Sequence, residues 1–284
     1  MTLPTSDTIV DYPSGATESS SSVVHVEGSY VVLDRTAFHP VDHVWPDQGA
    51  DRGVLRVEGH DYEVSDCVVG ATNGSDLFVG AEVPVRTGAE GWTFVVVHVV
   101  PEPGITLGDS VEVVVDEPFR EALSAGHTAC HLASLALDRA LADAWSKDAP
   151  LDALGAPAFD SLAIESSLIT EFGSRDVYRV GKSLRKKGFG VAALDDTTAL
   201  EAAINATLEE WVASDAAVRI ERDDEGLGDR RYWACSLPGG TATIPCGGTH
   251  LSTLAELAAI TVTLERENLE GAVGLTMVTT AARA

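Results

Sequence analysis

The stretch "GDSVEVVVDEPFREALSAGHTACH", residues 108–131, contains the point at which the hydrophobic pattern of the chain changes. Its first part, "DSVEVVVD", is rich in valine and interrupted by acidic residues, which is typical of a strand. Pro118 and Phe119 end that pattern, and the Ala/Leu-rich residues 121–147 place apolar side chains at helical spacing. The stretch therefore predicts a β-rich N-terminal part, followed by a part that begins with a long helix.

Residues 22 to 115 consist of short, β-branched-rich segments separated by Gly, Pro, Asn and Asp. Many short strands at this spacing predict a small antiparallel β-barrel or sandwich, and we assign a β-barrel to residues 22–118. Residues 1–21 are polar and lack a basic region followed by an apolar one, so they predict a flexible tail without a secretory signal.

The remainder, residues 119–284, mixes helical and strand patterns and predicts an α+β domain. Asp/Thr capping residues open an expected helix over 195–215. Strands are expected at "LAIESSLITEF" (162–172), "RRYWACSL" (230–237), "TATIPC" (241–246) and "GAVGLTMVTTA" (271–281), and a short helix and then a strand in "LSTLAELAAITVTLERE" (251–267).

The composition excludes several classes of protein. The 284 residues carry a formal net charge of −25, which argues against non-specific affinity of the whole surface for nucleic acid or membranes. No apolar run approaches the ~20 residues that cross a bilayer. The four cysteines form no short CxxC pair, so reduced thiols and a cytoplasmic location are expected.

Two pairs of metal-ligating residues share the same spacing. His127 and His131 lie four residues apart in the expected helix, and Cys246 and His250 repeat this spacing around Gly247 and Gly248. Each pair alone also fits an ordinary helix histidine pair or a buried thiol. Together they form a His₃Cys set suited to Zn²⁺. His39 and His43 have the same spacing, but Pro40 and the strand context argue against a shared helical face.

The segments "HTACHLAS" and "PCGGTH" resemble the HxxxH and CxxxH signatures of the alanyl-tRNA editing family, and "VVLDRTAFHP" (31–40) resembles its "LDxTxFYP" strand. This family comprises the editing domain of alanyl-tRNA synthetase and free-standing homologues. The resemblance implies a free-standing, zinc-dependent deacylase that removes serine or glycine from mischarged tRNA(Ala). The implied zinc ligands are His127, His131, Cys246 and His250. Where the family has "EGGGQPxDxG", this chain has "VDHVWPDQGADRG" (41–53).

Further residues fit this chemistry. Thr128 and Thr249 stand beside metal ligands, and either hydroxyl could contact the seryl hydroxyl or serve only in its helix or turn. The segment 175–190 concentrates basic residues and predicts contact with the tRNA acceptor end, or else a solvated basic face. We expect the rings of Tyr178 and Phe189, which flank these basic residues, to stack on the terminal bases. The expected tRNA contacts are Arg179, Lys182, Arg185, Lys186 and Lys187.

Two other functions remain compatible with the sequence. One is metal-dependent hydrolysis of another small aminoacyl or acyl ester. The other is a non-catalytic tRNA-binding module whose zinc is structural, for which four tight ligands and no open position would be typical.

Overall fold

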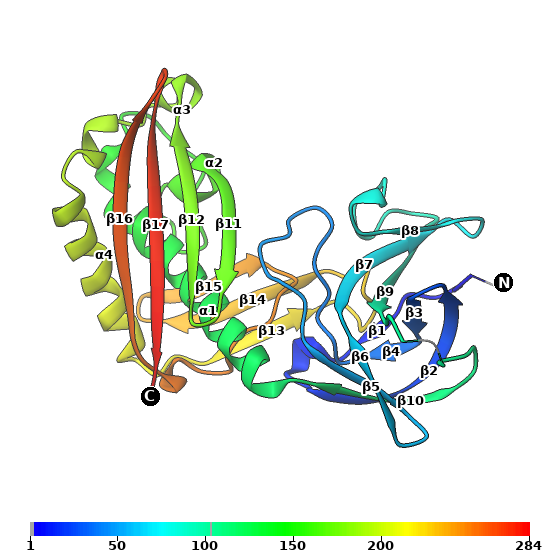
Figure 1. Cartoon of the computed structure of the whole chain (residues 1–284). Helices are drawn as coiled ribbons and strands as arrows, with labels where there is room; N and C mark the ends of the chain where they lie inside the picture. Colours follow the sequence, from blue (N-terminus) through cyan, green and yellow to red (C-terminus); the bar gives the residue numbers. More distant parts are fainter. Residues whose placement is uncertain (1–2, 103) are drawn as a thin grey trace. The chain divides into compact units, whose positions relative to one another are not determined.

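The computed structural model describes residues 3–102 and 104–284 and has a mixed α+β fold, as predicted (Figure 1). The chain divides into two compact units. The first comprises Met1–Glu121, Ile220–Tyr232 and Pro245–Thr249, and the second comprises Ala122–Arg219, Trp233–Ile244 and His250–Ala284. Both units therefore draw on the C-terminal half, which we expected to form one continuous domain over 119–284. Within the described residues, no helix is both long and apolar enough to cross a bilayer.

An eight-stranded sheet dominates the first unit, in the order β6-β5-β10-β2-β3-β9-β7-β8. The paired neighbours run antiparallel. Its strands are β2 (Glu18–Glu27), β3 (Tyr30–Leu33), β5 (Gly53–Val57), β6 (His60–Val64), β7 (Asp66–Thr72), β8 (Leu77–Val79), β9 (Thr93–Val99) and β10 (Ser110–Val115). The sheet is strongly curled (Figure 1). The core of this unit contains buried side chains that include Phe38, Leu55 and Phe94. Because β6 and β8 are its two edges in the described part of the chain, the predicted small β-barrel is not confirmed.

The N-terminal segment, which we expected to be a flexible tail, contains regular secondary structure where the structure describes it. Strand β1 (Ile9–Val10) pairs in parallel with β4 (Arg35–Thr36), a 3₁₀ turn follows at Tyr12–Ser14, and β2 already begins at Glu18. Val10 and Tyr12 are buried in the core of the unit. Burial of these few apolar side chains stabilises a segment whose overall composition is polar. Residues 1 and 2 of the predicted tail lie outside the described residues.

Helix α1 (Glu117–Ala140) confirms the predicted change of pattern after β10. The Asp116 carboxylate accepts the backbone N–H of Phe119 at 3.2 Å, and Pro118 occupies the first turn, where its missing N–H costs nothing. Almost all of the helix from Ala122 to Leu137 is buried, because small alanines let it pack closely against its surroundings.

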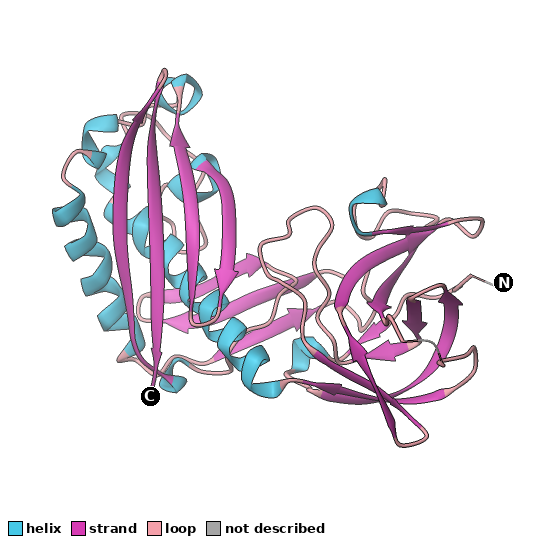
Figure 2. Ribbon diagram, in the orientation of Figure 1, coloured by secondary structure: helices cyan, strands magenta, loops and turns pink. Residues whose placement is uncertain are grey.

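The second unit contains a four-stranded antiparallel sheet in the order β11-β12-β17-β16 (Figure 2). Its strands are β11 (Ile164–Thr170), β12 (Gly173–Val180), β16 (Leu257–Leu269) and β17 (Ala272–Arg283). Helix α4 (Thr197–Val212) covers the edge strand β16: Asn205 bonds both the N–H and the C=O of Val262, at 2.7 and 3.0 Å. Occupying these backbone groups prevents the edge from pairing with another chain.

Most of the expected elements are confirmed. The Asp196 carboxylate caps α4, as the Asp/Thr pattern predicted, by accepting the N–H of Ala199 at 3.0 Å. The expected strands appear as β11, β14 (Arg231–Leu237), β15 (Gly240–Pro245), β16 and β17, with a 3₁₀ turn at Leu254–Glu256 before β16. The remaining elements are the 3₁₀ turns Gly80–Glu82, Ala142–Ala144 and Val191–Leu194, helices α2 (Phe159–Ala163) and α3 (Lys182–Lys186), and strand β13 (Val218–Arg222), which forms a sheet in the order β13-β14-β15.

Candidate metal centre

The helical half of the predicted metal site lies within α1. His127 and His131 are one turn apart, and their rings stack with centroids 4.8 Å apart. Gly126, immediately before His127, permits a very close approach: a Cβ there would lie 2.3 Å from the carbonyl oxygen of Thr170 and 2.6 Å from that of Gly173. The helix can therefore lie directly against the β11–β12 turn only because residue 126 has no side chain.

The loop after β15 supplies the other two predicted ligands. The backbone N–H of Cys246 donates to the carbonyl of Arg231 at 3.1 Å, and the N–H of Gly248 donates to the Cys246 Sγ at 3.4 Å. The His250 ring lies 4.3 Å from that of His127 and 5.0 Å from that of His131, centroid to centroid. The Trp233 ring lies 5.0 Å from His131 and bounds the cluster.

One candidate ligand atom from each of His127, His131, Cys246 and His250 lies within 4.8 Å of all the others. Ligands of tetrahedral Zn²⁺, at ~2.0–2.3 Å from the ion, are roughly 3.3–3.8 Å apart, so small side-chain rotations would suffice to bind one ion. The structure thus brings together the four residues that the sequence had paired, and a cluster of this composition could hold a metal.

The chemistry of these side chains fits a cation. The His131 Nε2 is buried and has no hydrogen-bond partner among the described residues. Burial lowers the pKa of His131 to about 4, so this imidazole is neutral near pH 7 with a lone pair available. Burial also raises the pKa of the Cys246 thiol to about 12, so binding of a cation must displace its proton.

Thr128 contacts the candidate ligand His250 and the residue that follows it. Its side chain is fully buried, its Oγ1 lies 3.3 Å from the His250 Nδ1, and it accepts the backbone N–H of Leu251 at 3.1 Å. A hydrogen bond to one imidazole nitrogen fixes the ring and directs the other nitrogen toward a metal. These contacts favour a positioning function for Thr128, and contact with substrate stays a prediction.

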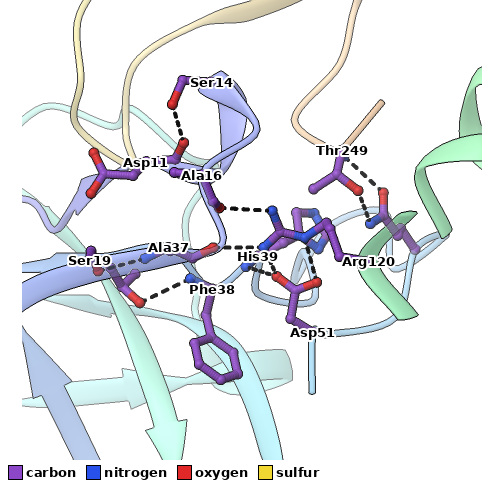
Figure 3. A network of polar contacts seen from close by, with 12 residues as sticks. Asp11, Ser14, Ala16, Ser19, Ala37, Phe38, His39, Asp51, Arg120 and Thr249 are labelled. Carbon is purple, nitrogen blue, oxygen red and sulfur yellow. Dashed lines mark hydrogen bonds and ion pairs between the residues drawn. The ribbon is translucent and has the colours of Figure 1, made fainter. Parts of the chain in front are cut away.

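Thr249 is held by a residue that the sequence analysis missed. The Gln48 amide nitrogen donates to the Thr249 Oγ1 at 2.8 Å, and the Thr249 N–H donates to the Gln48 Oε1 at 3.0 Å (Figure 3). Both side chains are almost fully buried. This reciprocal pair fixes the loop midway between Cys246 and His250. Substrate contact by Thr249 likewise stays a prediction.

A buried ion pair anchors the segment that contains Gln48. The Arg120 Nε donates to the Asp51 Oδ1 at 2.7 Å, and the Arg120 Nη2 donates to the Asp51 Oδ2 (Figure 3). The Arg120 Nη2 also donates to the carbonyl of Ala37 at 2.7 Å. The spacing Gln48, Asp51, Gly53 equals that of Gln, Asp and Gly in "GGQPxDxG". Matching this spacing, rather than the missing glycines, would have identified Gln48 and Asp51 from sequence.

The predicted tRNA contacts form an exposed basic surface in the second unit, on the end of β12 and on α3. Arg179, Lys182, Arg185, Lys186 and Lys187 are all exposed, whereas the two aromatic residues expected to stack on bases are not. Tyr178 is buried and donates to Asp160 at 2.9 Å, and Phe189 packs between Phe159 and Trp145. That stacking prediction is wrong, because both rings complete the core.

His39 and His43 do not join the metal cluster, as expected. His39 is buried against the Tyr12 ring, and His43 contacts the carbonyl of Val85 at 2.8 Å.

No protein-family model matches the chain. The chain is 32% identical over 165 residues to an alanine–tRNA ligase of Caldivirga maquilingensis, in an alignment that covers 53% of this chain and 16% of the ligase. It is 28% identical over 254 residues to the ligase of Frankia alni, which covers 86% of this chain and 24% of that ligase. The alanyl-tRNA editing protein AlaX-M of Pyrococcus horikoshii is 24% identical over 244 residues, covering 86% of this chain and 83% of AlaX-M.

The chain therefore spans only a minor part of the two ligases but most of AlaX-M. The clustering of His127, His131, Cys246 and His250 agrees with the family signatures that these positions resemble. These comparisons show that the chain is similar to part of the alanine–tRNA ligases and to most of an alanyl-tRNA editing protein, which supports the resemblance to the alanyl-tRNA editing family.

Proposed function

We propose that this protein is a zinc-dependent deacylase that hydrolyses tRNA(Ala) mischarged with serine or glycine. The observation that carries the proposal is the cluster of His127, His131, Cys246 and His250, whose candidate ligand atoms lie within 4.8 Å of one another. Similarity to an editing protein over 83% of its length supports this reaction class. A tRNA substrate is also consistent with the predicted cytoplasmic location.

A zinc ion held by these four residues would supply Lewis-acid chemistry, by polarising the ester carbonyl or acidifying water. Other residues of the chain would hold the metal ligands and the loop between them in place. Thr128 orients the His250 imidazole, and Gln48 holds the Thr249 loop. A hydroxyl or amide in this loop that bonded the seryl hydroxyl would discriminate against alanine, because alanine would leave that group unpaired. We therefore assign Thr249 to substrate selection and Thr128 to positioning.

The basic surface of the second unit would hold the acceptor stem. Arg179, Lys182 and Lys187 line a pocket of about 500 Å³ together with Glu165 and Gly271. The Arg185 guanidinium donates to the carbonyl of Gly271, which holds α3 against the β16–β17 turn. Arg179 lies 3.8 Å from Glu165, but both are about half exposed, so this ion pair contributes little and can yield to a phosphate.

A salt titration tests this surface. Each cation that neutralises a phosphate steepens the dependence of log Kd on log salt concentration by ~0.7–0.9. We expect the double substitution K186A/K187A to flatten the slope for tRNA binding by about 1.5. The double substitution E209A/E210A, on exposed acids of α4 in the same unit, is the matched control. An unchanged slope in K186A/K187A would remove these lysines from the interface.

A deacylation assay tests the function. The protein is incubated with Ser-tRNA(Ala), Gly-tRNA(Ala) and Ala-tRNA(Ala), with and without a chelator, followed by added zinc. Release of serine or glycine but not alanine, lost with chelator and restored by zinc, is expected. Turnover of small aminoacyl esters alone would instead indicate the more general ester hydrolase. Binding of tRNA without turnover, with zinc held tightly, would indicate a structural metal.

A further inference from the structure

A pocket of about 470 Å³ in the first unit borders Cys246. Its walls include Asp42, Arg230, Arg231, Tyr232, Cys246 and Gly247. This volume lies within the ~300–1,000 Å³ that is usual for sites that bind small molecules or single nucleotides. Because Cys246 belongs to the candidate metal centre, a molecule in this pocket would lie beside a candidate metal ligand.

Arg231 brings a fixed positive charge to the pocket. Its guanidinium donates to the backbone carbonyls of Gly226 and Leu227 at 3.2 and 3.1 Å, and a Cβ at Gly247 would lie 3.9 Å from its Nη2. Its Nε is buried and has no hydrogen-bond partner within the described part of the chain. A guanidinium that is held by neutral carbonyls keeps its charge available for an anionic ligand.

Asp42, which lines this pocket, belongs to a loop that carries the exposed Trp45 three residues further along the chain. The Asp42 Oδ1 accepts the backbone N–H groups of Val44 and Trp45 at 2.7 and 2.8 Å, and the N–H of Asp47 donates to the carbonyl of Trp45 at 2.9 Å. These bonds fix the tip of the loop, yet 44% of Trp45 remains exposed. An exposed tryptophan on a loop whose backbone is fixed in this way is suited to stacking on a nucleobase.

We propose that the Val44–Trp45 loop tip and the adjacent pocket receive the 3′-terminal nucleotide of the aminoacylated tRNA. Trp45 stacks on its base, and Arg231 faces its phosphate. This inference rests on the proposed function, because the ester that is hydrolysed is carried by the ribose of that nucleotide. The ribose must therefore lie close to the metal centre, and Cys246, one of the four candidate ligands, lines the pocket.

The charges in the pocket favour one nucleotide over a longer stretch of backbone. Asp42 accepts the two N–H groups of the tip, and Asp229 accepts the N–H of Gly226 at 2.8 Å, so both carboxylates serve the local fold. The pocket wall contains as many acids as arginines, so it carries no net positive charge, although the Arg231 guanidinium itself is bonded to neutral carbonyls. The pocket would then bind the terminal nucleotide by stacking on its base, and the basic surface of α3 and β12 would bind the phosphates of the acceptor stem.

The test uses the full-length protein and an RNA minihelix of the tRNA(Ala) acceptor stem, with or without its 3′-terminal adenosine. Affinity is measured by direct titration for the wild type, W45A, W45F and L107A. Leu107 is the matched control, because it is another exposed apolar residue of the first unit. KM and kcat are then measured with the minihelix charged with serine.

We expect wild-type affinity to fall about tenfold when the terminal adenosine is absent, which is typical for the loss of one stacked base. W45A should bind both minihelices with the lower affinity and show a correspondingly raised KM, whereas W45F should recover most of the loss and L107A should match the wild type. R231Q should also raise KM.

If removal of the terminal adenosine changes the minihelix affinity of the wild type and of W45A by the same factor, the inference is overturned, even if the wild type deacylates Ser-tRNA(Ala). The converse result, Trp45-dependent recognition of the adenosine without deacylation, would support the inference and contradict the proposed function. Failure of the wild type to bind either minihelix would overturn both.

Discussion

Gly126 offers a sharp test of how α1 is placed, because two physical effects predict opposite signs for Gly126→Ala. Alanine in a helix interior is favoured over glycine by about 1 kcal/mol. The tertiary structure opposes this gain, since the new Cβ would lie 2.3, 2.6 and 2.8 Å from the Thr170 oxygen, the Gly173 oxygen and the Gly173 nitrogen. All three are backbone atoms, which cannot rotate away as the end of a side chain can.

The β11–β12 turn that contains these atoms is hydrogen-bonded to α1 on one side and to β17 on the other. The N–H of Phe172 donates to the carbonyl of Ala122 in α1 at 2.8 Å, and the carbonyl of Phe172 accepts the N–H of Ala281 in β17 at 2.7 Å. Relieving the overlap therefore requires the helix to move away from the sheet. Overpacking of this kind typically costs 1–3 kcal/mol or more, and we place this site at the upper end because backbone must move. Subtracting the helical gain leaves a net destabilisation of about 2 kcal/mol.

The assay is thermal unfolding together with zinc titration. A loss of about 2 kcal/mol should lower Tm by roughly 4–8 °C in a protein of this size. Because His127 adjoins Gly126, zinc affinity should fall at least tenfold. Gly181→Ala is the control: its backbone angles are ordinary and a Cβ there meets nothing within 4 Å. If Gly126→Ala has an unchanged or higher Tm and normal zinc affinity, the close approach of α1 to this turn is not what fixes the helix.

The other predictions concern the metal cluster and a buried acid. Cys246→Ser should reduce bound zinc, measured by elemental analysis after dialysis, well below one equivalent; full retention would show that the thiol is not a ligand. Thr128→Val should weaken zinc binding by ~10–100-fold, the usual effect of removing a hydrogen bond to a ligand, while Thr128→Ser restores it. Because burial raises the pKa of Cys246 to about 12, zinc should displace the proton of this thiol at every pH below this value. Zinc affinity should therefore rise about tenfold for each unit of increase in pH. Calorimetry in buffers of different ionisation enthalpy detects the released proton. Burial raises the pKa of Asp138 to about 8, so this group takes up a proton on folding and the wild type loses stability as pH rises from about 4 to 8. Asp138→Asn keeps the acceptor for the Asp160 N–H and should unfold at a higher denaturant concentration than the wild type at pH 8, with a smaller difference at pH 5.

Local patterns predicted much of the secondary structure, because they depend on neighbours in sequence. The alternation of valines before Asp116, the Asp196 cap of α4 and the period of α1 each reflect interactions within one element. Strand β12 was missed because its basic side chains suggested a charged surface segment, yet the alternate residues Asp176, Tyr178 and Val180 are buried. The buried positions of Val10 and Tyr12 were missed because a few apolar residues in a polar segment give a weak signal.

The sequence by itself identified the four side chains of the candidate metal cluster, since equal spacing in two short motifs restricts which atoms can converge. It could not determine what surrounds them. The Gln48–Thr249 pair joins residues 201 positions apart, and the Thr128–His250 contact joins residues 122 positions apart. Tyr178 and Phe189 turned inward while Trp45 stayed exposed. Only the tertiary structure decides such pairings, because they depend on how closely packed elements share their remaining polar groups and apolar surface.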